Sequence, residues 1–264
     1  MRKIDLLNTN AKDRFDEYTE LLFKRDTLEK EAGSILIAYT KRFGEKLADN
    51  FRLKIECIKK KKMLAYCQTC INSDRKIDVA VMSKKIDADM QLYEYELQQM
   101  IERNRAAKDA EPVGMFRSER SKKIYRRLVK KLHPDGNVIL MENETLRDLW
   151  DKIVSAYKRS DDEMLGDLET MVRKELEKLG EDWLSEIPED IEARIERVTN
   201  EINEILNTEP YTYRALLIDD DKSDAKLKEL DDEHEEFTKY LAELNEMLEK
   251  ILLNGSNTIW RMSL

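Results

Sequence analysis

Residues that could do acid–base, nucleophilic or metal chemistry are few in this chain, apart from its many carboxylates. The chain holds two histidines and three cysteines among 264 residues. It has no glycine-rich phosphate loop, no HExxH zinc motif, and no cysteine or serine paired with a spare histidine. Acid–base catalysis would have to rest on carboxylates, which are too numerous for any one to stand out. We therefore predict that the protein is not an enzyme and has no cofactor.

The pair Cys67 and Cys70 has the CxxC spacing of metal and redox sites. A zinc site requires about four ligands, and the sequence offers no second cysteine pair. Cys67 and Ile71 stand one helical turn apart, so they can instead be packing residues of a helix seam. The three acids that begin at Asp219 lack the glycine and the terminal glutamate of an EF-hand loop. We therefore predict no metal site.

The most distinctive stretch is a basic helix, residues 121 to 132, followed by His133, Pro134 and Asp135. Isoleucine and leucine recur along it at four-residue steps, so one helical face is apolar. The opposite face is basic and holds Arg120, Lys122, Lys123, Arg126, Arg127, Lys130 and Lys131. Because a proline disfavours the helical conformation in the residue before it, the helix should end near His133. We expect His133 and Asp135 at an exposed corner.

A second amphipathic helix is predicted after a polar connection. Its apolar face holds Leu146, Trp150, Ile153 and Tyr157, and Ala156 is small enough to let another helix approach closely. Two such helices joined by a polar turn form an antiparallel hairpin with an apolar seam.

These residues resemble the J-domain, the module by which DnaJ-type co-chaperones engage DnaK-type chaperones. The family's second helix is basic and ends in a His-Pro-Asp tripeptide, as the helix before His133 does here. Its third helix carries an aromatic residue, an apolar residue three later, and Ala-Tyr three and four after that. Trp150, Ile153, Ala156 and Tyr157 have this spacing. The resemblance covers about residues 116–168.

Two features depart from the family pattern. We find no Tyr-x-x-Leu-Gly-Val first helix directly upstream, where the residues from Pro112 to Phe116 stand instead. After Tyr157 the chain enters another predicted helix, which begins near Ser160 and ends near Gly180. We expect that helix to cover the J-like core from the side that the first helix normally closes.

The resemblance implies a DnaK-type chaperone as partner. Its acidic surface would meet the basic helix, and the His-Pro-Asp corner would trigger ATP hydrolysis by the chaperone. The residues that would make these contacts are His133, Pro134, Asp135, Lys123, Arg126, Arg127 and Lys130. The alternative is a non-catalytic helical scaffold or oligomerisation protein that keeps the J-like fold without stimulating a chaperone. Nucleic-acid binding fits the local basic charge but not the net charge of −9.

The composition indicates an all-α protein of long helices, because 39% of the residues are charged and there are only seven glycines and four prolines. In the N-terminal part we predict a helix over about residues 10–42, a stop at Gly44, and a hairpin of residues 45–71 against 77–105. The second arm of this hairpin has apolar residues at heptad spacing.

In the C-terminal part, two further heptad patterns run over residues 191–205 and 227–251. They predict a second antiparallel hairpin, with His234 as a seam residue. The predicted domains are thus 1–110, 111–180 with the J-like module, and 181–264 with a short tail from Thr258. The hairpins could hold a client or mediate self-association.

The location expected from the sequence is cytoplasmic. No stretch reaches about 18 consecutive apolar residues, and the N-terminus lacks the apolar segment of a signal peptide. An odd number of cysteines in a long chain also gives no sign of a disulfide framework. We predict no membrane contact.

Overall fold

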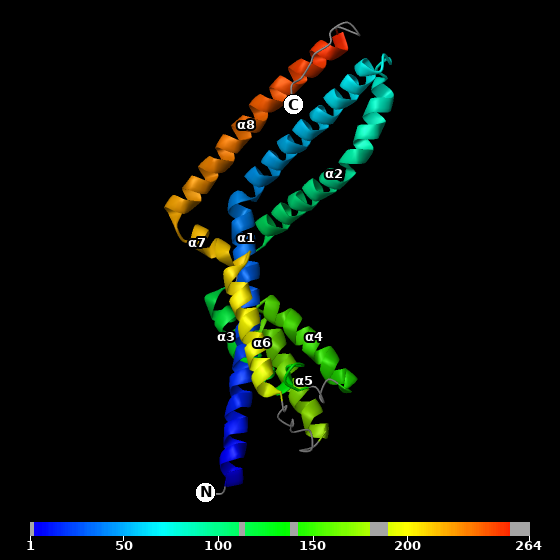
Figure 1. The fold of residues 1–264 in the computed structure, drawn as a ribbon. Coiled ribbons are helices and arrows are strands. Elements are labelled where there is room, and N and C mark those ends of the chain that lie inside the picture. Colours follow the sequence, from blue (N-terminus) through cyan, green and yellow to red (C-terminus); the bar gives the residue numbers. More distant parts are fainter. Residues whose placement is uncertain (1–2, 111–113, 138–141, 180–189, 254–264) are drawn as a thin grey trace. The chain divides into compact units, whose positions relative to one another are not determined.

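The computed structural model describes residues 3–110, 114–137, 142–179 and 190–253 (Figure 1). Within these ranges the regular elements are helices and there is no strand, so the all-α prediction is confirmed. The tail from Thr258 lies outside the described residues. The α-helices are α1 (Lys3–Asn72), α2 (Val79–Asp109), α3 (Met115–Leu132), α4 (Glu144–Lys158), α5 (Asp162–Leu179), α6 (Ile191–Asn207), α7 (Arg214–Leu217) and α8 (Asp220–Leu253).

The helices group into two compact units, and each unit combines distant parts of the chain. Unit 1 consists of Met1–Leu36 and Glu111–Arg214, and unit 2 consists of Ile37–Ala110 and Ala215–Leu264. These units differ from the three predicted domains, 1–110, 111–180 and 181–264. The predicted C-terminal hairpin requires correction in particular, because α6 packs within unit 1 whereas α8 belongs to unit 2.

Unit 1 has its core where α3, α4 and α5 pack together with the first part of α1 and with α6. The α3 helix ends at Leu132, as the following proline predicts, and α4 begins behind Asn143, whose side chain accepts a hydrogen bond from the Leu146 N–H. The α5 helix buries its apolar face against α3 and α4, and the first part of α1 packs on the same core. Fully buried side chains of unit 1 include Tyr18, Leu22, Tyr125, Leu128, Leu132, Leu146, Ile153, Tyr157 and Leu165.

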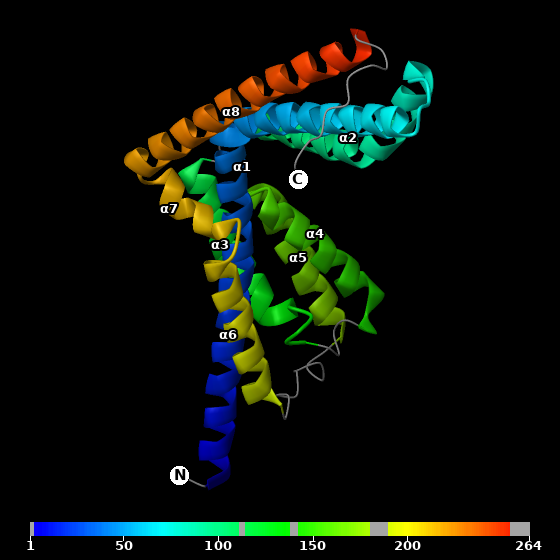
Figure 2. The same ribbon diagram turned by 45° about the horizontal axis from the view of Figure 1, so that its top comes forward.

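Unit 2 packs α2 and α8 against the second part of α1 (Figure 2). Its apolar cluster is formed by Ile55, Cys67, Met82, Ile86, Met90 and Leu248. Cys67 is thus a packing residue, and all three cysteines are buried free thiols. Buried Asn50 donates to the Leu230 carbonyl at 2.8 Å and lies 3.0 Å from His234 Nδ1. His234, although exposed, therefore contacts α1 from the predicted seam side of α8.

The predicted helix stop at Gly44 is wrong, because α1 runs through this position without interruption. Gly44 instead marks a close approach of α2. The Asn104 side-chain N–H donates to the Gly44 carbonyl at 2.7 Å, and a Cβ at Gly44 would overlap Asn104 Oδ1. A glycine can therefore be required by a neighbouring helix even in a helix interior, where it lowers helix propensity.

The two glycines of α1 should respond in opposite ways to alanine. Gly33→Ala should raise the free energy of unfolding by about 0.5–1 kcal/mol, because a Cβ there meets nothing within 4 Å. Gly44→Ala should lower it by about 1 kcal/mol, because Asn104 must move and lose its hydrogen bond. Denaturant unfolding followed by circular dichroism measures both changes. Equal stabilisation by the two variants would contradict the role given to Gly44.

Candidate functional site

The His133-Pro134-Asp135 corner is a tight turn that directly continues α3. The His133 N–H still bonds the Val129 carbonyl at 3.0 Å, so the helix closes normally. The His133 carbonyl then accepts hydrogen bonds from the N–H groups of Gly136 at 3.0 Å and Asn137 at 2.9 Å. The backbone of the corner is therefore fixed by its own hydrogen bonds.

His133 itself points inward, which corrects the prediction that it is exposed. The residue is only 4% exposed. Its Nδ1 accepts the Asp135 N–H at 3.2 Å, and its ring packs edge-on against Trp150 with centroids 5.0 Å apart. Its Nε2 lies 3.6 Å from a carboxylate oxygen of Asp26 on α1. The prediction considered the α3–α4 hairpin alone, and it is α1 that covers the ring.

Arg25 of α1 is the centre of a charged network beside the corner. Its guanidinium lies 3.0 Å from Asp26, 3.3 Å from the Asp135 carboxylate and 3.1 Å from Glu201 of α6. Asp26 also accepts a hydrogen bond from the Tyr125 hydroxyl at 2.7 Å. Burial by itself would raise the pKa of Asp26, but hydrogen bonds from His133 and Tyr125 and the charge of Arg25 hold it below its ordinary value.

Asp135, like Pro134, stays partly exposed at the corner. Its carboxylate-bearing side chain is 37% exposed, although it contacts Arg25. Its backbone carbonyl accepts hydrogen bonds from Arg194 of α6 at 2.8 Å and from the Tyr18 hydroxyl of α1 at 3.3 Å. Two helices outside the α3–α4 hairpin therefore hold the corner in place.

The predicted basic face of α3 points outward, but three of its four predicted contact residues are paired with the chain's own carboxylates. Arg126 and Lys130 both contact Glu20 of α1, at 2.8 and 2.9 Å. Arg127 contacts Glu169 of α5 at 2.7 Å. Lys123 is exposed and has no ion pair with another described residue. All four cations remain at the surface, where an incoming partner can reach them.

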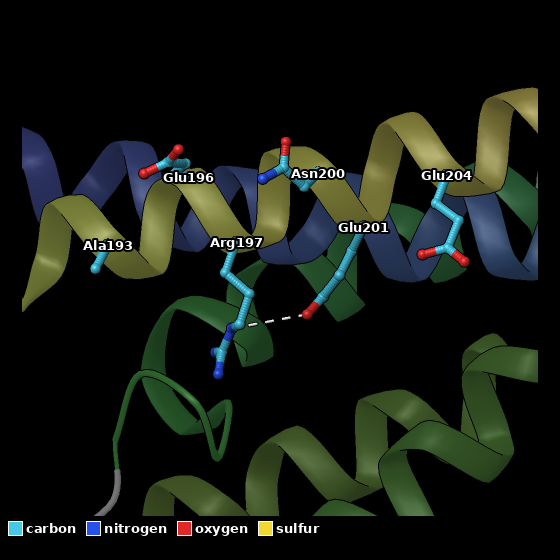
Figure 3. Close-up of a pocket in the computed structure, with 6 residues that line it drawn as sticks. All are labelled: Ala193, Glu196, Arg197, Asn200, Glu201 and Glu204. Atoms are coloured by element: carbon cyan, nitrogen blue, oxygen red, sulfur yellow. Dashed lines mark ion pairs between the residues drawn. The ribbon is translucent and has the colours of Figure 1, made fainter.

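A shallow, open depression lies along one stretch of α6, whose side chains Figure 3 shows. Its lining residues are Ala193, Glu196, Arg197, Asn200, Glu201 and Glu204. Arg197 and Glu201 form an ion pair at 3.7 Å, and Glu201 also binds Arg25. Glu201 therefore links this stretch of α6 to the charged network of the corner, and three of the four charged residues in the stretch are glutamates.

Sequence reasoning missed the part played by α1, notably Tyr18, Arg25 and Asp26. A signal was present, because Tyr18, Leu21 and Leu22 recur at helical spacing and give this part of α1 an apolar face. Tyr18 and Leu22 are fully buried in unit 1. The apolar spacing shows that a face is buried but does not specify which helices bury it.

Comparison of the chain with family models, with curated proteins and with solved structures gives no match. Across the described ranges, no helix combines the length and the apolar character needed to cross a membrane. The same residues contain no group of three or more histidine, cysteine, aspartate or glutamate side chains placed to hold a metal ion.

Proposed function

We propose that the protein is a J-domain-like co-chaperone or adaptor. It would engage a DnaK-type chaperone through Asp135 and the basic face of α3 and stimulate the chaperone's ATPase, acting in the cytoplasm. The observation that carries the proposal is the placement of Asp135, partly exposed, at the end of an outward basic face. Opposite charges would steer an acidic chaperone surface to this face and fix its orientation.

In this proposal the residues of the corner have different tasks. Asp135 is accessible and would contact the chaperone, whereas buried His133 would keep the corner attached to α1 through Asp26. Lys123, Arg126, Arg127 and Lys130 would supply the attractive charge. ATP would be bound and hydrolysed by the chaperone, so this chain needs no catalytic group of its own. The helices of unit 2 would hold a client or a second copy.

The test is steady-state ATP hydrolysis by the DnaK-type chaperone of the source organism, with wild type or Asp135→Asn added. We expect wild type to stimulate hydrolysis and Asp135→Asn to lose the stimulation. Arg25 still pairs with Asp26 and Glu201 when Asp135 is replaced by the neutral asparagine, so this variant should remain folded. A thermal unfolding curve checks this. His133→Gln is a poorer probe, because the change alters a buried side chain. Absence of stimulation by wild type would refute the proposal for that chaperone.

The burial of His133 favours the second candidate, a helical scaffold that uses the J-like hairpin only for packing. In that case the corner is part of the core that joins α3, α4 and α1. A scaffold predicts that neither wild type nor Asp135→Asn changes the chaperone's ATPase. It also predicts that Asp135→Asn leaves the cellular role of the protein intact, whereas a working co-chaperone would lose it.

A further inference from the structure

We infer that Glu20 of α1 is a built-in competitor for the cations that the proposed chaperone would bind. One Glu20 oxygen contacts Arg126 at 2.8 Å, and the other accepts from Arg126 Nε at 3.0 Å and from Lys130 at 2.9 Å. The Glu20 carboxylate thus pairs with two of the four predicted contact residues, Arg126 and Lys130, and it binds Arg126 through both oxygens. The inference rests on the proposed function, and it adds a determinant of affinity at the same site.

The position of Glu20 is part of a wider pattern of carboxylates along both edges of the basic face. On the α1 side, Asp16 lies 3.8 Å from Lys130, and Glu31 lies 3.6 Å from Lys122. On the α5 side, Glu169 binds Arg127 with both oxygens. The chain therefore already places negative charge beside the cations of α3, as an acidic partner would.

Glu20 can compete without being essential for the fold. Its side chain is 34% exposed, and the side chains of Arg126 and Lys130 are more exposed still. Ion pairs at such exposed positions contribute little to stability. Burial would raise the pKa of Glu20, but hydrogen bonds from Lys130 and Arg126 hold it below its ordinary value, so the carboxylate is charged at neutral pH. An acidic partner must therefore displace a charged competitor.

The matched variants are Glu20→Gln and Glu17→Gln, which remove the same charge from the same helix. Glu17 is exposed and pairs with Arg14 rather than with α3. In the ATPase assay at low salt, Glu20→Gln should reach half-maximal stimulation at a concentration about 3 to 10 times lower than wild type. Glu17→Gln should behave as wild type, and the advantage of Glu20→Gln should fade as added salt screens the charges. If wild type stimulates and both variants match it, the inference fails while the proposed function stands.

A second measurement does not depend on the chaperone. Fluorescence anisotropy would follow the binding of a fluorescein-labelled polyglutamate peptide to each full-length variant at low ionic strength. Glu20→Gln should bind the peptide several-fold more tightly than Glu17→Gln, and adding Arg126→Gln and Lys130→Gln should abolish the gain. Equal affinities would overturn the inference. A gain with the peptide, together with no ATPase stimulation by any variant, would uphold the competition and reject the chaperone as partner.

Discussion

Arg25→Met is expected to lower the free energy of unfolding of unit 1 by about 3–5 kcal/mol, the usual result of removing one partner from a buried ion pair. The Arg25 side chain is only 17% exposed and contacts three carboxylates. Without it, Asp26 and Asp135 would lose their guanidinium partner, and Glu201 would keep only its ion pair with Arg197. Denaturant unfolding followed by circular dichroism provides the measurement.

The loss should depend on pH in a defined direction. The pKa of Asp26 is below its ordinary value in the folded protein. Its charged form therefore contributes stability that is present at neutral pH and is lost as the pH falls through the folded pKa. The difference between wild type and Arg25→Met should accordingly shrink in acid, at pH values below about 4.

Arg14→Met is the control for this prediction. Arg14 lies on the same helix and pairs with Glu17 and Glu192, but all three side chains are well exposed. Its loss should leave the free energy of unfolding nearly unchanged, because exposed ion pairs contribute little to stability. A similar small effect for Arg25→Met would show that the charged network does not stabilise the corner.

Tyr157→Ala is the second change with a large expected effect, also about 3–5 kcal/mol. The Tyr157 ring is fully buried and lies parallel to the Tyr125 ring, with centroids 3.8 Å apart. The Lys30 ammonium stands over the ring, 4.0 Å from its centroid. Alanine would leave a cavity between α3, α4 and α1 and would remove both contacts. Thermal unfolding and the near-ultraviolet circular dichroism of the aromatic residues would report the change.

Tyr157→Phe distinguishes the contribution of the aromatic ring to stability from that of its hydroxyl group, because only the hydroxyl is removed. The hydroxyl is hydrogen-bonded to Thr27 of α1 at 3.0 Å, and this single bond should be worth about 0.5–1.5 kcal/mol. The phenylalanine variant should remain folded even if the alanine variant does not. Equal losses for the two variants would mean that the stacked ring is not the main contribution.

Local signals in the sequence were sufficient for the helices around the candidate site. The four-residue apolar steps and Pro134 define α3 and its end, because helical period and proline act within a few residues. The same reasoning placed the four predicted cations on one outward face. These features depend on the helix alone and not on its neighbours.

The features that sequence reasoning missed all depend on a distant partner. Gly44 was interpreted as a helix stop, but its role is set by Asn104 of another helix. The heptad spacing of α6 and α8 shows that each has an apolar face, but it does not specify which helix covers that face. The inward orientation of His133 likewise follows from Asp26, which lies more than a hundred residues earlier in the chain.

The division of both units into separate stretches of chain has a consequence for biosynthesis. Tyr18 and Leu22 leave the ribosome long before residues 111–214, whose side chains bury them. At typical synthesis rates the delay is about 10–35 s, during which this apolar surface has no native partner. A fragment that contains unit 1 alone would therefore have to join residues 1–36 directly to 111–214, because residues 37–110, which lie between them in the chain, belong to unit 2.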